Sequence, residues 1–382
     1  MAGDYYIELR DFVTGARSAI ITGAIGSGDA GGNGFTSLAC RRLVNAPGLL
    51  TFTVPERFPG VATLPDKTQV VLWRRDAARG IDWYREFVAI LRDPTYTKRN
   101  GQGNWQFSCP GLMSLLSWYH VLWPAAMTNR TAFTAAKAET IMKTLATYNA
   151  VAGVATAAAG RDRDAPNYGI SVQADGAGGA TINWTAGRSK TLLEELQSIA
   201  LIAGGDFDLV YVSGTSREFR WYSGQRGSDK SATLTFAENL GNMDNIQFKR
   251  VRSTERTVAV VGGQGTEGAR DTVVRTGTNY SSTNDIEVFI DARDVEKGAT
   301  VQLQSRGDKR LDEMESRDTW SFDVIQTDGT YYGPSGGGSY TLGDLVRAVR
   351  PDGVAVTQQI AEVALDWKGD GQEEIGIVMR TK

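Results

Sequence analysis

The feature that most constrains the fold of this chain is a glycine-rich turn with β-strand patterns on both sides. Gly263, Gly265 and Gly268 have the G-x-G-x-x-G spacing of a dinucleotide-binding turn. The β-branched run Thr257–Val261 precedes them as a strand would. Asp291 follows at about the distance, roughly twenty residues, of a ribose-binding carboxylate.

The residues after the glycines decide between a cofactor site and a simple turn. A phosphate-binding turn must open a helix, because the N–H groups at the start of that helix hold the pyrophosphate. The next segment, Asp271–Gly277, is β-branched, ends in glycine and has no 3.6-residue apolar period. The motif is therefore interpreted as a glycine-rich β-hairpin, and the sequence favours a structural protein over a dinucleotide-dependent enzyme.

Composition limits the size and the partners of the protein. A chain of 382 residues predicts two or three domains at about 150 residues each. A formal net charge of −3 provides no basic field to neutralise phosphates, which argues against tight DNA binding and leaves loose contact open. The 44 glycines indicate many turns, as in a β-rich chain.

The reactive side chains are few. Cys40 and Cys109 are too few for a disulfide framework or a four-cysteine zinc site, and their apolar surroundings predict buried thiols. His120 is the single histidine, so clusters of histidine ligands are excluded, and its aromatic context predicts a packed or edge residue. The acidic, alternating N-terminus predicts no signal peptide, and Ala150–Ala159 is too short to span a membrane.

Alternating apolar and polar residues predict most of the strands. Before the predicted helices they occupy Tyr5–Phe12, Ser37–Leu43, Gly48–Val54, Gln69–Arg74, Asp82–Leu91 and Trp105–Cys109, with a short helix at Leu112–Trp118. Later ones are a hairpin of Asp206–Val212 with Glu218–Ser223, and Thr319–Ile325, Leu342–Val349, Val354–Leu365 and Glu374–Met379. The glycine-rich segment Ile20–Gly34 and the segment Tyr331–Gly338 are predicted loops.

Three segments have a helical period. Thr134–Asn149 and Lys190–Ala203 place apolar residues on one face, and Asp308–Arg317 is the only helix expected after residue 232. In the second segment, Thr191 and Glu194 form a possible capping box. We therefore expect a β-rich domain at 1–125, an α+β domain at 126–235 and a second β-rich domain at 236–382.

Other possible chemical sites have simpler interpretations. Asp366–Gly371 hints at a calcium loop, but Lys368 and Ile377 stand where oxygen ligands are needed, so a Gly-Asp-Gly hairpin turn is favoured. Glu194, Glu195, Asp312, Glu313 and Glu315 are expected on solvated helix faces, although counting cannot exclude a glycosidase pair. Six tryptophans are expected in strands as packing residues or sugar platforms: Trp73, Trp83, Trp105, Trp184, Trp221 and Trp320.

Four segments together resemble the baseplate-hub or tail-hub proteins of tailed bacteriophages, which are minor tail proteins at the distal end of the tail tube. They are Phe87–Leu116, Lys190–Val212, Phe236–Arg270 and Tyr340–Trp367. Their order and spacing span most of the chain. The resemblance also accounts for the glycine motif, because such proteins tend to place a Gly-rich turn between strands there.

The resemblance implies a mainly β fold: two tail-tube-like β-barrel or sandwich domains, the β-rich ones above, plus the smaller α+β domain. It implies a non-enzymatic homotrimer, with no catalytic, cofactor-binding or metal-binding residue, whose six β-domains form a pseudo-sixfold ring. That ring would join the sixfold tail tube to threefold spike or fibre proteins and let DNA pass through its lumen during ejection. The implied partners are the distal tail, tape-measure and spike or central fibre proteins, in the virion, with no stable membrane insertion.

Two other classes of function stay open at this point. One is a tail-associated peptidoglycan hydrolase that uses Asp and Glu side chains. The other is a carbohydrate-binding receptor module that uses exposed tryptophans. The segment Ile20–Gly34 is not required by the hub pattern, and we expect it to be an interface loop that orders on assembly.

Overall fold

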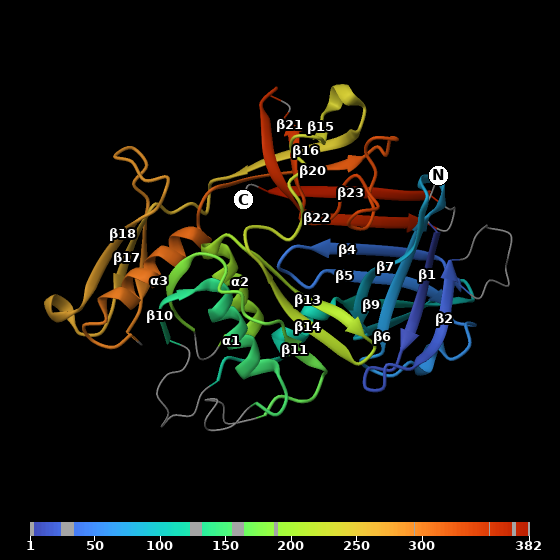
Figure 1. Ribbon diagram of the computed structural model, residues 1–382, viewed down its shortest axis with the longest axis horizontal. Helices are drawn as coiled ribbons and strands as arrows, with labels where there is room; N and C mark the ends of the chain where they lie inside the picture. The colour runs from blue at the N-terminus through green and yellow to red at the C-terminus, as the bar shows by residue number, and fades with distance from the viewer. Residues whose placement is uncertain are drawn as a thin grey trace.

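The computed structural model describes residues 4–23, 34–122, 132–154, 164–186, 190–293, 295–350, 352–368 and 372–380. Strands dominate, and they form two large sheets with smaller sheets beside them (Figure 1). This confirms the predicted mainly β class. The large sheets pack as a sandwich, and none of the sheets formed by the described strands closes into a barrel.

The first sheet has five strands in the order β3-β2-β1-β6-β7. The neighbours are antiparallel except for β2 and β3. Their bounds are β1 Asp4–Arg10, β2 Arg17–Gly23, β3 Gly34–Phe35, β6 Gln69–Asp76 and β7 Ile81–Ile90. Part of the predicted loop Ile20–Gly34 is therefore strand, and its remainder at 24–33 lies outside the described residues.

The second sheet has ten strands and joins the two ends of the chain. Its main path is β16-β20-β23-β22-β4-β5-β9-β8; off this path β21 pairs with β22, and β15 pairs with β21. The strands from the first part of the chain are β4 Ser37–Leu43, β5 Leu49–Pro55, β8 Asp93–Arg99 and β9 Gln102–Pro110. Those from the last part are β15 Thr235–Phe236, β16 Met243–Val251, β20 Arg317–Val324, β21 Leu345–Val349, β22 Ala355–Lys368 and β23 Gln372–Arg380.

The largest hydrophobic core lies between these two sheets. Ile7 of β1 and Leu72 of β6 pack in the same cluster as Phe52 of β5, Leu365 of β22 and Ile377 of β23. Period-2 alternation puts these side chains on one face of each strand, as a half-buried sheet requires.

A second core joins the α+β elements to the other face of the first sheet. Val71 of β6, between two residues that face the first core, packs here, so β6 is buried on both faces. The elements of this core are a 3-10 helix Leu112–Trp118, α1 Ala138–Ala150, β11 Ile170–Val172, β12 Thr181–Thr185, α2 Leu192–Ala203, β13 Asp206–Ser213 and β14 Ser216–Tyr222. The strand β10 Ala132–Lys137 pairs with β12.

A small unit lies between β16 and β20 in the chain, at one end of the molecule's long axis (Figure 1). The helix α3 Thr300–Glu313 covers a three-stranded sheet of order β18-β17-β19 and packs Leu303 and Leu311 against it. The bounds of these strands are β17 Val258–Gly262, β18 Thr272–Thr276 and β19 Glu287–Asp291.

The predicted bounds of two helices were wrong. The first helix begins at Ala138 and not at Thr134, because the residues before it pair with β12 across a bulge at which Ala135 has φ of 48°. The last helix begins eight residues before the predicted Asp308 and ends before Arg317. The part that was not predicted, 300–307, contains Thr300, Val301 and Gly307, which are weak helix formers. The capping box of α2 is confirmed, with the Thr191 hydroxyl accepting from the Glu194 N–H.

A close backbone contact fixes the α+β elements on the first sheet. Gly15, in the turn after β1, lies against Gly214, in the turn between β13 and β14, and a Cβ added to Gly214 would lie 2.7 Å from the Gly15 Cα. The Gln69 side chain donates to the carbonyl oxygen of Gly214 at 2.6 Å beside this contact.

We expect Gly214→Ala to lower the free energy of unfolding by about 1–3 kcal/mol, because two backbones must separate to admit the methyl group. Gly329→Ala is the matched control, since a Cβ there meets nothing within 4 Å, and it should change stability by less than about 0.5 kcal/mol. Urea unfolding followed by tryptophan fluorescence measures both variants. Equal stability of the two would contradict the proposed role of the contact.

Candidate functional site

The glycine motif is a β-hairpin, as predicted. The strand β17 ends at Gly262, and β18 follows antiparallel to it after a single 3-10 turn at Glu267–Ala269. The guanidinium of Arg270 donates to the Gly262 and Gly263 carbonyl oxygens at 2.9 and 3.0 Å and to Asp291 Oδ1 at 2.7 Å. The turn thus binds an arginine of its own chain, and the candidate ribose carboxylate is that arginine's partner.

The reactive side chains singled out by sequence do not come together in one site. Cys40 and Cys109 are free, buried thiols, as predicted, on strands that both flank β5. Burial raises the pKa of each thiol. His120 is exposed and bridges to Thr191 beside α2. The Gly-Asp-Gly turn at 369–371 lies outside the described residues, and its flanking residues Lys368 and Gln372 pair as the end of a hairpin.

The candidate acids and tryptophans are mostly packing or surface residues. Glu194 is exposed and caps α2, whereas Glu195 is buried beside Lys309 of α3, so its predicted solvated position was wrong. The six tryptophans lie in strands, as predicted, with Trp184, Trp221 and Trp320 buried: Trp73 in β6, Trp83 in β7, Trp105 in β9, Trp184 in β12, Trp221 in β14 and Trp320 in β20. Within the described ranges, no group of three or more His, Cys, Asp or Glu side chains could hold a metal ion.

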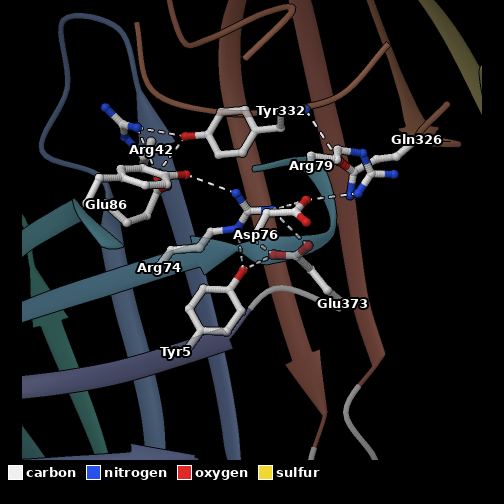
Figure 2. A network of polar contacts seen from close by, with 10 residues as sticks. Tyr5, Arg42, Arg74, Asp76, Arg79, Glu86, Gln326, Tyr332 and Glu373 are labelled. Carbon is white, nitrogen blue, oxygen red and sulfur yellow. Dashed lines mark hydrogen bonds and ion pairs between the residues drawn. The ribbon is translucent and has the colours of Figure 1, made fainter. Parts of the chain in front are cut away.

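The most elaborate polar site is a buried network between the two large sheets (Figure 2). Arg74 of β6 is fully buried and donates to both carboxylate oxygens of Glu373 of β23, at 2.7 and 2.9 Å. The Tyr5 hydroxyl of β1 donates to the same carboxylate. Arg74 also donates to the Tyr84 hydroxyl of β7 at 3.0 Å, so a single guanidinium ties three strands of one sheet to the other sheet.

A second ion pair extends the network to β4. Arg42 donates to Glu86 of β7 and to the Tyr332 hydroxyl, both at 2.7 Å, and that hydroxyl donates to Glu86 at 2.6 Å. Tyr332 belongs to the predicted loop Tyr331–Gly338 and is fully buried. The loop is thereby held against both sheets.

The charges of the network balance. Three arginines, Arg42, Arg74 and Arg79, oppose Asp76, Glu86 and Glu373 (Figure 2). Burial opposes the ionisation of Glu86, but Arg42 and Arg74 hold the pKa of its carboxyl below the ordinary value. Burial, and then the neighbouring carboxylate Glu373, raises the pKa of Tyr5, so this phenol stays a neutral donor.

A second buried junction links the α+β elements to both ends of the chain. Asp206, at the start of β13, accepts from Asn45 at 3.2 Å and from Gln359 of β22 at 2.6 Å, and Arg380 of β23 lies at 3.7 Å. Asn45 also accepts from the Phe207 N–H at 2.8 Å. Residues from three distant parts of the chain therefore meet at one carboxylate.

These network residues were missed by the sequence analysis, although a signal was present. Arg42, Arg74 and Glu373 each stand at the phase of the strand alternation that points inwards, in line with buried apolar neighbours. A charged residue at an inward position needs a buried partner. The pattern predicts that such partners exist, but pairing them requires the register of strands far apart in the chain.

The ten-stranded sheet has one face in the core and one face that is exposed and polar. The exposed face is hollowed by about 650 Å³ over β4, β16, β20, β22 and β23. The hollow holds one arginine and four carboxylates: Arg41, Asp323, Glu362, Asp366 and Glu374. At one edge of the sheet, all seven residues of β8 are exposed, and β16 forms the other edge.

The fold is similar to those of solved bacteriophage tail proteins. The fold is similar to the 43 kDa tail protein of prophage MuSo2 from Shewanella oneidensis, with a TM-score of 0.58, 11% identity and coverage of 100% of this chain and 98% of that chain. It is also similar to the tail protein from Neisseria meningitidis MC58, with a TM-score of 0.55, 11% identity and coverage of 99% and 97%. At these identities the likeness concerns the fold.

A solved complex from Francisella is also similar in fold. A chain of the Francisella PdpA-VgrG complex matches with a TM-score of 0.55 and 8% identity, over 99% of this chain and 53% of that chain. The sequence itself matches the family described as Siphovirus ReqiPepy6 Gp37-like protein over residues 31–379, and the chain belongs to that family. It has no match among curated protein sequences.

We expect Glu373→Gln to lower the free energy of unfolding by about 3–5 kcal/mol, because it leaves the buried Arg74 cation without its carboxylate. Glu374→Gln, one residue further on, is the matched control. It removes an exposed pair with Lys368 and should cost less than about 1 kcal/mol. Chemical unfolding at neutral pH measures both, and similar losses would contradict the role of the network.

A pH dependence follows from Glu86. The pKa of its carboxyl is lowered in the folded protein. As the pH falls below about 4.5, this carboxyl therefore takes up a proton in the unfolded chain before it does so in the folded protein. The stability that Glu86 contributes is therefore present above about pH 4.5 and is lost as the pH falls through its lower folded value. Between pH 7 and about pH 3, Glu86→Gln should lose less stability than the wild type, although it is less stable at pH 7. Parallel pH profiles of unfolding free energy for the two proteins would refute this.

Proposed function

We propose that this protein is a structural hub at the distal end of a bacteriophage tail. In this proposal three copies form a ring that joins the sixfold tail tube to threefold spike or fibre proteins, and the ring surrounds a channel for DNA ejection. Membership of a siphovirus family and the tail-protein fold support it. The single observation that carries it is the construction of the ten-stranded sheet.

The main path of that sheet consists of two similar halves. Outward from the central pair, one half is β4-β5-β9-β8 and the other is β22-β23-β20-β16. Each half is a set of four antiparallel strands, and the halves come from opposite ends of the chain. Three such chains would present six four-stranded units around an axis, which suits contact with a sixfold tube on one side and a threefold partner on the other.

The edges and the exposed face of the sheet suit closure into a ring. An exposed edge strand such as β8 presents unpaired backbone groups that another strand can pair with, and closure removes such edges. The exposed face carries more carboxylates than cations in its hollow. A channel lined by this face would repel phosphates, so DNA could slide without binding.

The buried networks would give the ring its rigidity. Arg74 and Glu373 hold the two sheets in one orientation, and Asp206 holds the α+β elements on both halves. A hub must keep its surfaces in place for several neighbours, so we propose that the distal tail, tape-measure and spike or central fibre proteins bind these surfaces in the virion. The role is non-enzymatic in this proposal. No described helix has the length and apolarity to span a membrane.

Cryo-electron microscopy of the purified oligomer, or of the tail tip of the virion, tests the proposal. We expect a threefold ring of the 41.4 kDa chain with a central channel, in which β8 of one copy lies beside β16 of the next. A ring whose contacts avoid both edges, or tail tips that lack the protein and remain infectious, would contradict it. Clearing of cell-wall material in zymography would favour the hydrolase hypothesis, and glycan binding lost on substituting Trp83 would favour a receptor module.

A further inference from the structure

The two edge strands of the ten-stranded sheet carry charges that no ion pair uses. On β8, Asp93 begins the strand and Arg99 ends it. On β16, Asp244 lies near the start and Lys249 near the end, so the acid precedes the base on both strands. All four residues are exposed, and none of them has an ion-pair partner in the part of the chain that the structure describes.

The two charges of β8 point away from the core. Asp93 pairs with Ser108 of β9, and Arg99 pairs with Gln102. Both partners stand at the phase that alternates with Phe107, which is buried in the core between the sheets. Because directly opposite residues of two strands share a face, Asp93 and Arg99 lie on the exposed face of the sheet.

The two charges of β16 lie on the same face. Asp244 pairs with Asp323 of β20, and Lys249 pairs with Thr319, at the phase that alternates with the buried aromatic residues of β20. Asp323 lines the hollow of the exposed face. A bulge between Asp244 and Gln247 adds one residue to β16 and leaves both charges on this face.

The backbone of both edges can pair with a further strand. In the main path, β8 has only β9 as a neighbour and β16 has only β20. Pro94 removes at most one N–H group from the edge of β8. Such edges are templates for strand pairing between chains.

The direction of that pairing follows from the order of the strands. With β15 and β21 set aside, the ten-stranded sheet has eight strands in its main path, and every neighbouring pair is antiparallel. The first and last strands, β16 and β8, therefore run in opposite directions. Rotation about an axis along the strands keeps the direction of each strand, so β8 of one copy runs antiparallel to β16 of the next.

We infer that a second copy of this chain completes each edge, with β8 antiparallel to β16 and with Asp93 facing Lys249 and Arg99 facing Asp244 across the seam. The inference rests on the proposed ring, and it assigns the residues that select one direction of pairing. The antiparallel seam brings each acid to a base. A parallel seam would place Asp93 beside Asp244 and Arg99 beside Lys249, and like charges on opposing strands are destabilising.

Two registers satisfy both pairs. In the first register, Asp93 lies directly opposite Lys249, and Arg99 is diagonal to Asp244. In the second, two residues away, Arg99 lies directly opposite Asp244, and Asp93 is diagonal to Lys249. Diagonal neighbours on one face are within reach of long side chains, so either register uses all four charges.

Exchange of the charges tests the pairs in the purified full-length chain. Asp93→Lys should weaken association about tenfold, because repulsion replaces attraction at each seam, and Lys249→Asp should do the same. The double variant Asp93→Lys/Lys249→Asp restores the pair with its signs exchanged and should recover most of the association. Lys368→Asp is the control, since it makes the same sign change on the central strand β22 and should leave association unchanged. A dilution series in mass photometry measures all four variants.

Cysteine pairs determine the register. In the first register Thr95 lies opposite Gln247, and in the second Thr97 does. Under mild oxidation, either Thr95→Cys/Gln247→Cys or Thr97→Cys/Gln247→Cys should yield covalently linked trimers on a non-reducing gel, and the single-cysteine variants should not. The native Cys40 and Cys109 are buried and will not compete.

The outcomes separate the seam from the ring. Threefold rings in which neither cysteine pair links, and in which the charge variants assemble as the wild type does, would overturn the seam and leave the proposed ring in place. A wild-type chain that stays monomeric at its highest soluble concentration would overturn a seam formed by two copies alone, and the ring would then be decided on the tail tip. A linked trimer together with recovery in the double variant would establish the seam.

Discussion

The pairing of Arg74 with Glu373 is the interaction on which the rest of the structure depends. It places a guanidinium in the space between two sheets, where a charge is unfavourable unless a carboxylate meets it with correct geometry. Apolar side chains alone would let the sheets slide, because hydrophobic packing has no direction. The Arg74 guanidinium donates to the two Glu373 carboxylate oxygens at 2.7 and 2.9 Å, and this paired geometry favours one orientation of the two sheets. Together with the Arg42–Glu86 pair, it holds the ten-stranded sheet in place against the first sheet.

Local patterns predicted most of the strands, because alternation over five to eight residues is a property of each segment. They also predicted the capping box at Thr191 and the hairpin at Gly263, whose neighbours in sequence supply the whole signal. Where tertiary pairing overrode propensity, prediction failed: Ala135 and Ala136 are good helix formers, yet β10 pairs with β12. Glu195 was predicted on a solvated helix face, but it is buried beside Lys309 of α3, which lies more than a hundred residues later in the chain.

The candidate sites could be predicted only in part for a related reason. An inward-pointing arginine such as Arg74 indicates that a buried acid exists. Its partner Glu373 lies almost three hundred residues away, and neither segment contains a pattern that identifies the other as its partner. The division into domains at 1–125, 126–235 and 236–382 stays a prediction, and the large sheet draws its strands from the first and the last of these segments.

The central pair of the large sheet, β4 with β22, has a consequence for how the chain is made. Leu43 pairs with Glu362, so during synthesis β4 leaves the ribosome long before its neighbour exists. Until then the strand has a bare edge, and such edges invite association between nascent chains. The ten-stranded sheet becomes continuous only after β22 has been synthesised, so a chain that stops before β22 leaves β4 without its partner strand.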